Sequence, residues 1–182
     1  TSVRNVIINH FNTELNTFDS IFRRSILLNK IDTISPAILN SQLTIRAQQV
    51  IDGVVAGQNK DYSVAFPFTL ASPDKDEHII VSSPFTYKGQ TVYIKNELGS
   101  TRLQLLDTSN EVKLVNTGSY DPANGLVSLS GLKVDIPTTI KINVIPANTS
   151  TIRPLRNYIL TLDQSSLAVT GTAEPSNTKV VL

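Results

Sequence analysis

The sequence predicts an α+β protein in which an N-terminal helical pair precedes an antiparallel, β-rich, sandwich-like body. Near the start of the chain apolar residues recur every three or four positions, which is the period of a helix with one apolar face. From about residue 38 they alternate with polar residues instead, as in a half-buried strand. Short strand-like runs separated by turn residues then continue, as in a β-sandwich or partial barrel. We expect residues 1–50 to hold the helical pair and the first long strand, and residues 51–182 to form the sandwich-like domain.

Two helices are expected before the first proline. The first begins after Ser2, whose hydroxyl suits an N-cap position. Its apolar stripe consists of Val3, Ile7, Phe11, Leu15 and Phe18. The second helix is expected over residues 19–31. It cannot extend past Ser35-Pro36, because the residue before a proline avoids the helical region.

The first strands are expected to be long. One covers residues 38–50, and the next covers residues 62–70, where the alternation is the most regular in the chain. Pro67 lies inside the second strand. Because proline cannot donate a ladder hydrogen bond, we expect an edge strand or a bulge there.

Shorter strands are expected along the rest of the chain. They lie near residues 78–82, 91–95, 101–106, 111–116, 126–130, 140–145, 158–162 and 167–171. Turn-forming residues separate several of them. These are Lys88-Gly89, Leu98-Gly99, Ser109-Asn110 and Ala123-Asn124-Gly125. Asn-Gly between two apolar runs favours a hairpin.

Composition and charge argue against several classes of function. Among 182 residues, 16 Lys and Arg balance 15 Asp and Glu to give a net charge of +1, whereas nucleic-acid binders usually have a basic excess or stripe. No apolar run approaches the ~20 residues of a transmembrane helix. We therefore expect neither a nucleic acid nor a membrane as partner. The chain has no cysteine or methionine and begins with Thr1, so we expect no disulfide or thiolate site and interpret the chain as a fragment of a longer protein or a processed product.

Two polar clusters are candidate sites of chemistry. Residues 74–78 (DKDEH) are the densest set of metal-ligating side chains, but their spacing does not match a calcium-binding loop and favours a solvated turn. His10 and Glu14 stand at a spacing that an acid–base pair could use, but His10 borders the apolar stripe, which favours a core position. The serines lack the G-x-S-x-G context of a nucleophile. We expect no enzyme activity, catalytic residue, metal site or cofactor.

Six runs of residues resemble one known family in their order and spacing. They are FRRSILLNKID (22–32), IL (38–39), LTIR (43–46), FTYKG (85–89), GSYDPANGLV (118–127) and RPLRNYILTLD (153–163). The chain resembles the C-terminal part of the large inner-wedge protein of contractile-tail phage baseplates, in its T-even-type version, which belongs to the baseplate J-like family. The likeness covers nearly the whole chain, and this family has no catalytic motif to transfer.

The resemblance implies a structural role. Members of this family assemble as wedge components, pair with copies of themselves and close into a ring around the tail hub, and the C-terminal region of the T-even relative is a dimerisation region. We therefore expect a virion protein of the tail baseplate, assembled in the host cytoplasm. Its expected partners are a second copy, in a homodimer and a higher ring, and other baseplate wedge proteins. A chain without disulfides suits assembly in a reducing cytoplasm.

Aromatic and arginine side chains are enriched at self-complementary contact patches. The candidate contact residues are Phe18, Phe22, Arg23, Arg24, Arg153 and Arg156. For the Arg23–Arg24 pair the alternative is a solvated helix face. For at least one of the two phenylalanines, plain core packing is the stronger expectation.

Two other functions stay open at this point. A polar β-rich composition with five tyrosines is compatible with a carbohydrate-binding or adhesin-like β-sandwich, although the chain lacks the tryptophan often used to stack on sugars. A metal-dependent enzyme built on residues 74–78 is the third hypothesis.

Overall fold

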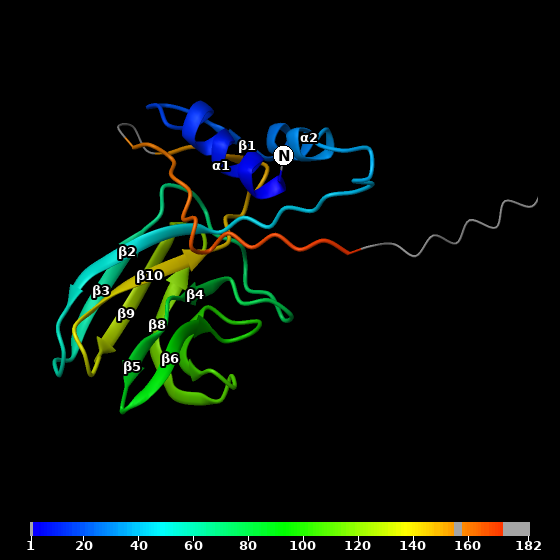
Figure 1. Cartoon of the computed structure of the whole chain (residues 1–182). Helices are drawn as coiled ribbons and strands as arrows, with labels where there is room; N and C mark the ends of the chain where they lie inside the picture. Colours follow the sequence, from blue (N-terminus) through cyan, green and yellow to red (C-terminus); the bar gives the residue numbers. More distant parts are fainter. Residues whose placement is uncertain (1, 155–157, 173–182) are drawn as a thin grey trace, which may run out of the picture.

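The computed structural model of the chain describes residues 2–154 and 158–172. Within these residues, a pair of helices near the N-terminus is followed by a largely antiparallel β body, so the predicted α+β class is confirmed. Figure 1 shows the helices at one end of the β body. No helix among the described residues has both the length and the apolar character needed to cross a membrane.

Helix α1 spans Val3–Glu14, and the Ser2 hydroxyl caps it by accepting a hydrogen bond from the Asn5 N–H at 3.3 Å. The expectation that this helix continues to Phe18 is wrong. The Ser20 hydroxyl donates to the Leu15 carbonyl at 2.8 Å, and Asp19 has a φ of 60°. Polar residues in this stretch thus provide a hydrogen-bond donor to a carbonyl at the helix end and turn the chain.

The second helix is also shorter than expected. Strand β1 (Phe22–Arg23) occupies the first part of the predicted range, and helix α2 begins only at Arg24 and ends at Asp32. The chain from residue 38 to residue 46 has no strand, so the long strand predicted there is wrong apart from its end.

The β body contains the strands from β2 to β10. They are β2 (Ala47–Val54), β3 (Lys60–Ala65), β4 (Ile80–Ser82), β5 (Phe85–Tyr87), β6 (Gln90–Asn96), β7 (Arg102–Asp107), β8 (Val112–Asp121), β9 (Leu126–Leu132) and β10 (Thr138–Val144). In the described residues they form one sheet in the order β2-β10-β4-β6-β7-β8-β9-β3, with β5 paired to β6. The strands at the two ends of this order, β2 and β3, contact each other. The sheet is therefore nearly closed on itself.

The four predicted turns are confirmed as hairpin connections. They join β5 to β6, β6 to β7, β7 to β8 and β8 to β9. Lys88 and Gly89 have φ angles of 49° and 73°, as both central residues of a type I′ turn require. This turn type matches the right-handed twist of the strands it joins.

Strand β3 is the last strand of the pairing order, as expected of an edge, but it ends before Pro67. The Phe66 N–H donates to the Gly125 carbonyl at 2.8 Å, and Pro67 has no N–H to continue the ladder. The only irregularity in the β3–β9 register lies between Lys60 and Tyr62. The expectation of a strand through residue 70 is therefore wrong beyond Ala65.

Near the C-terminus the predicted strands over residues 158–162 and 167–171 are also wrong. Described residues 158–172, which we call the strap, contain no strand or helix. A different segment is extended instead. Strand β11 (Thr151–Ile152) pairs antiparallel with β1 to form a two-stranded ribbon.

Buried apolar residues form two clusters. The larger fills the β body, and the smaller joins α1, α2 and the ribbon with leucines of the strap. We call α1, β1, α2, β11 and the strap together the cap. The cap therefore draws on both ends of the chain, and the boundary expected at residue 50 falls inside β2.

Candidate functional site

The β1–β11 ribbon brings together residues that lie far apart in the sequence. Phe22 is opposite Ile152, and Arg23 is opposite Thr151. The Arg24 N–H extends the ribbon by donating to the Ser150 carbonyl at 3.0 Å. Because side chains alternate along a strand, Phe22 and Ile152 point into the cap core and Arg23 points to solvent.

The two candidate phenylalanines occupy opposite environments. Phe22 is only 2 % exposed and stacks on Phe11, with ring centroids 5.8 Å apart. Phe18 is 64 % exposed in the turn between α1 and β1. The core alternative therefore holds for Phe22, and Phe18 is the one that is free to contact another molecule.

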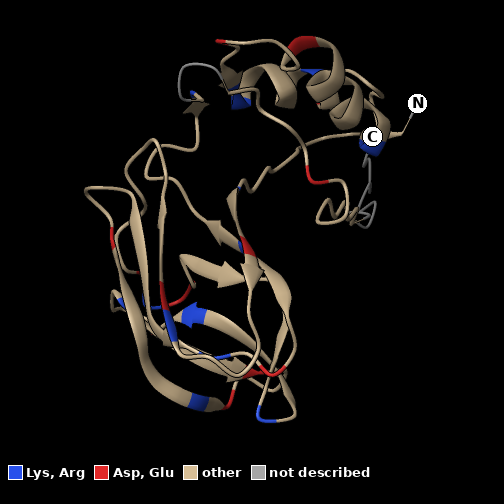
Figure 2. Ribbon diagram, turned by 90° about the vertical axis from the view of Figure 1, so that its left-hand side faces the viewer, with Lys and Arg blue, Asp and Glu red and all other residues tan. Residues whose placement is uncertain are grey.

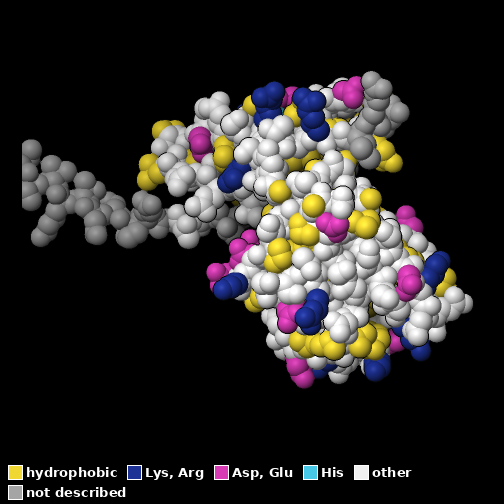
Figure 3. Space-filling model, turned by 180° about the vertical axis from the view of Figure 1, so that it is seen from behind, with side chains coloured by type: hydrophobic (Ala, Val, Ile, Leu, Met, Phe, Trp, Pro, Cys, Tyr) yellow, Lys and Arg dark blue, Asp and Glu magenta, His cyan; other side chains and the backbone are white. Residues whose placement is uncertain are grey.

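Three candidate arginines lie on or beside the ribbon. Arg23 and Arg153 are exposed, and Arg24 is half-buried. The Arg24 Nε atom is buried and has no hydrogen-bond partner among the described residues. Arg156 lies outside the described residues. In the view from behind, basic side chains stand out on the cap (Figure 3), whereas over the ribbon diagram as a whole charges of both signs are scattered (Figure 2).

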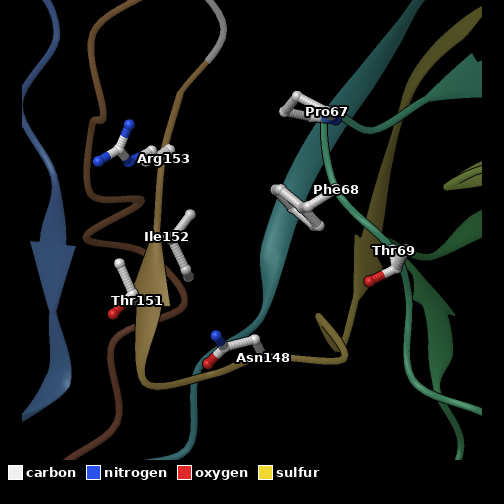
Figure 4. A pocket seen from close by; sticks show the side chains of 7 residues that line it. All are labelled: Pro67, Phe68, Thr69, Asn148, Thr151, Ile152 and Arg153. Carbon is white, nitrogen blue, oxygen red and sulfur yellow. The ribbon is translucent and has the colours of Figure 1, made fainter.

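A shallow groove of about 260 Å³ separates the ribbon from the segment after β3. It is lined by Pro67, Phe68, Thr69, Asn148, Thr151, Ile152 and Arg153. In Figure 4, Phe68 and Ile152 face each other across it, and the Arg153 side chain turns away toward β1. Phe68 packs against both apolar clusters, so this groove marks the junction of cap and body. It offers no pair of titratable groups for acid–base chemistry.

The strap ties the cap to the body through one carboxylate. The Lys141 ammonium lies 2.7 Å from Asp163 Oδ2, and the Gln48 amide donates to the same oxygen at 3.1 Å. The Ser165 hydroxyl donates to the other oxygen at 2.5 Å. Lys141 first, then Ser165 and Gln48, hold the pKa of Asp163 well below its usual range.

The same strap is fastened to helix α1. The Arg4 guanidinium donates to the carbonyls of Leu167 at 2.8 Å and Gln164 at 2.9 Å. Three strap leucines also pack against the cap core. They are Leu160, Leu162 and Leu167. The strap therefore joins the helices of the cap to strands β2 and β10 of the body.

His10 occupies a closed site inside the cap. It is 4 % exposed, and its Nδ1 lies 3.1 Å from Glu14 Oε2. Glu14 also pairs with Lys30 of α2, whose ammonium lies 3.4 Å from His10 Nδ1. Burial lowers the pKa of His10, although the nearby Glu14 opposes that shift. The interpretation of His10 as a core residue is confirmed. Its ring makes edge-on contacts with the rings of Phe11 and Phe22.

In the acidic run at residues 74–78, the side chains of Asp74, Glu77 and His78 make structural hydrogen bonds or ion pairs. Asp74 Oδ1 accepts from the backbone N–H groups of Asp76 at 2.6 Å and Glu77 at 3.1 Å. Glu77 pairs with Arg46 at 3.0 Å, and His78 Nδ1 donates to the Asn96 carbonyl at 2.7 Å. The described residues contain no group of three or more His, Asp and Glu side chains arranged to hold a metal ion.

No protein-family model and no curated protein matches the chain.

Two features of the candidate site, the ribbon and the strap, are not expected from the sequence. Two-residue strands carry no measurable period, and the ribbon partners are distant in sequence. The alternating leucines of the strap resemble a strand, and only the absence of a neighbouring ladder in the described residues distinguishes them.

Proposed function

We propose that this chain is a structural subunit of a contractile-tail phage baseplate wedge, and that its cap pairs with the cap of a second copy. One observation carries the proposal: candidate contact residues from two distant sequence runs meet at the ribbon of the cap, with Phe22 and Arg23 in β1 and Arg153 directly after β11. Those runs are two of the six that resemble the wedge family.

The chemistry of the cap surface supports self-association. Exposed Phe18, Arg23 and Arg153 are of the residue types that dominate interface energetics. A two-fold contact places each patch against its own copy, so an arginine can lie over the phenylalanine of the partner. Arginine stacks favourably on aromatic faces, which avoids opposing like charges.

The remaining features support a structural rather than a catalytic role. The groups with catalytic potential, at His10 and at residues 74–78, are engaged in packing and turn formation. The near-zero net charge allows copies to approach without strong repulsion. Other wedge proteins and the virion baseplate are the remaining partners and the location that the proposal implies.

Four of the five tyrosines give the carbohydrate-binding alternative no support, and Tyr158, in the strap, is 60 % exposed. A lysine ammonium lies over one face of the Tyr62, Tyr87 and Tyr93 rings, 5.2–5.8 Å from the ring centroid. Tyr120 is buried. These rings are therefore not open platforms for stacking on sugars.

Light scattering over a wide concentration range tests the proposal. We expect the wild-type chain to be at least a dimer over the whole range. The double variant Arg23→Glu/Arg153→Glu should raise the dimer Kd at least tenfold, because it replaces the exposed cation of the ribbon and the one directly beside it. Arg102→Glu, at an exposed arginine of the body, is the matched control and should leave the Kd within twofold. A wild-type chain that stays monomeric throughout would contradict pairing through the cap.

A further inference from the structure

The first half of strand β8 has a strand neighbour on one side only. Strand β7 pairs with β8 through Val112, Leu114, Gly118 and Ser119. On the other side, β9 pairs only with the last four residues of β8, from Gly118 to Asp121. Among the described residues no strand covers residues 112–117 on that side. We call this segment the free edge.

The free edge ends near two residues whose φ angles are positive. Asn116 has a φ of 59° and Gly118 a φ of 143°. A Cβ atom at position 118 would collide with the Ser128 carbonyl oxygen, so only glycine permits the close approach of β8 to β9 here. Before this point the strand diverges from β9, as a bulged strand does.

The free edge exposes apolar side chains. Val112, Leu114 and Val115 are 43 %, 36 % and 62 % exposed. Leu114 also lines an opening of about 280 Å³ shared with Gly131 of β9 and with Tyr87. An unpaired edge that carries exposed apolar residues is a template for pairing with another strand.

The one charged side chain of this segment does not protect the edge. Natural edge strands are often guarded by a lysine that projects into the approach path. Here the Lys113 ammonium lies 2.8 Å from Glu111 and 3.1 Å from Asp107, the last residue of β7. Its charge is therefore neutralised by groups of the β7–β8 hairpin.

We propose that the free edge of β8 pairs antiparallel with the free edge of a second copy of this chain. The segment is complementary to itself in the register that places Leu114 opposite Leu114. In this register Lys113 faces Val115 of the other copy, and no like charges stand opposite each other. Directly opposed apolar side chains are favourable and like charges unfavourable in an antiparallel pair.

This contact lies away from the cap. The far end of β8 approaches the cap side, where the Leu70 N–H donates to the Pro122 carbonyl at 2.8 Å and Phe68 joins the cap core. Val112 starts the strand at the opposite end of the body. In Figure 3, apolar side chains are visible at the end of the body that lies farthest from the cap. A subunit with two different two-fold contacts links copies into a chain or ring, whereas a single contact stops at a dimer.

Sedimentation equilibrium of the Arg23→Glu/Arg153→Glu variant isolates the edge contact from the cap contact. We expect residual association in this background, and Val115→Lys should raise its Kd at least tenfold by placing a charge in the pair. Ile136→Lys, at a non-strand site that is 60 % exposed, is the matched control and should change the Kd less than twofold. Equal effects of both lysine substitutions would overturn the proposal.

Amide hydrogen exchange locates the contact without a substitution. In the wild-type chain, exchange over residues 112–117 should slow at least fivefold between dilute and concentrated samples. Exchange that is independent of concentration at these residues overturns edge pairing. Slowing confined to residues 20–24 would leave the proposed cap pairing supported and the edge contact refuted, so the two proposals fail separately.

Discussion

The ammonium of Lys141 and the carboxylate of Asp163 lie 2.7 Å apart and join strand β10 of the body to the strap of the cap. Gln48 of β2 donates to the same carboxylate oxygen at 3.1 Å. Two neighbouring strands of the body thus bind one side chain of an otherwise irregular segment. The carboxylate of Asp163 therefore helps to hold the strap against the body.

We expect Asp163→Asn to destabilise the chain by about 1 kcal/mol at pH 7, the upper end for partly exposed ion pairs. The folded-state pKa of Asp163 is lowered, so its contribution is fully present above the unfolded pKa of about 4. The contribution is lost as pH falls from that value through the folded-state pKa, because the unfolded chain takes up a proton before the folded chain does. The difference in melting temperature between wild type and variant should be largest near neutral pH and shrink below pH 4.

Asp76→Asn is the matched control for this substitution. Asp76 is exposed, and its carboxylate has no hydrogen bond to the described residues. Its variant should melt within about 1 °C of wild type at neutral pH, as surface substitutions usually do. A pH-independent loss in Asp163→Asn would show that the strap is held by packing alone.

Local chemistry makes several elements predictable. The hairpin at Lys88-Gly89 is predictable because glycine adopts a positive φ at no steric cost and here stands between two strand-like runs. The Ser2 cap is predictable for a similar reason. The end of α1 is not, because Leu15 continues the helical stripe and is buried, even though the chain there has already left the helix.

The candidate site is only partly predictable. Composition marks Arg23 and Arg153 as contact residues, but it cannot show that one lies in the ribbon and the other directly after it. The strap has the pattern of strands because Leu160 and Leu162 alternate as they would in a sheet. In the structure these leucines pack against the cap helices and not in a sheet. This packing is a tertiary effect, so the local hydrophobic period of the sequence does not reveal it.

Gly118→Ala should cost about 3 kcal/mol of unfolding free energy. A methyl group there meets the Ser128 backbone in a region of φ that L-residues rarely adopt, and both strain and overpacking contribute. Gly57→Ala is the control, because its φ of 77° is also positive but no atom lies within 4 Å of the added group. It should cost only about 1 kcal/mol. Equal costs from urea denaturation would argue against the close β8–β9 approach.

The cap should lose stability as pH falls from 7 to 5 because of His10. Its folded-state pKa is lowered by burial, so below the unfolded pKa of about 6.5 the unfolded chain binds a proton that the folded chain does not. Glu14 of α1 and Lys30 of α2 are the charged groups that face it. The protection factors of the α1 amides, which correct for the slower intrinsic exchange at lower pH, should fall over this range in wild type.

His10→Leu should remove most of this loss of protection, since the neutral side chain cannot take up a proton. His78→Gln, a change at the only other histidine, should retain it. If both variants keep the wild-type pH dependence, another group in the cap is responsible.

The contrast between Phe22 and Phe18 provides the sharpest test of the cap core. Phe22 is buried between Phe11 and the ribbon partner Ile152, so Phe22→Ala should cost about 3–4 kcal/mol, the usual range for a deleted core phenylalanine. Phe18→Ala removes an exposed ring and should cost less than about 0.5 kcal/mol. Because the body has its own apolar cluster, exchange protection in Phe22→Ala should fall in α1, α2 and β11 while strands β6 and β7 stay protected. Loss of protection in the body as well would mean that the two clusters unfold as one cooperative unit.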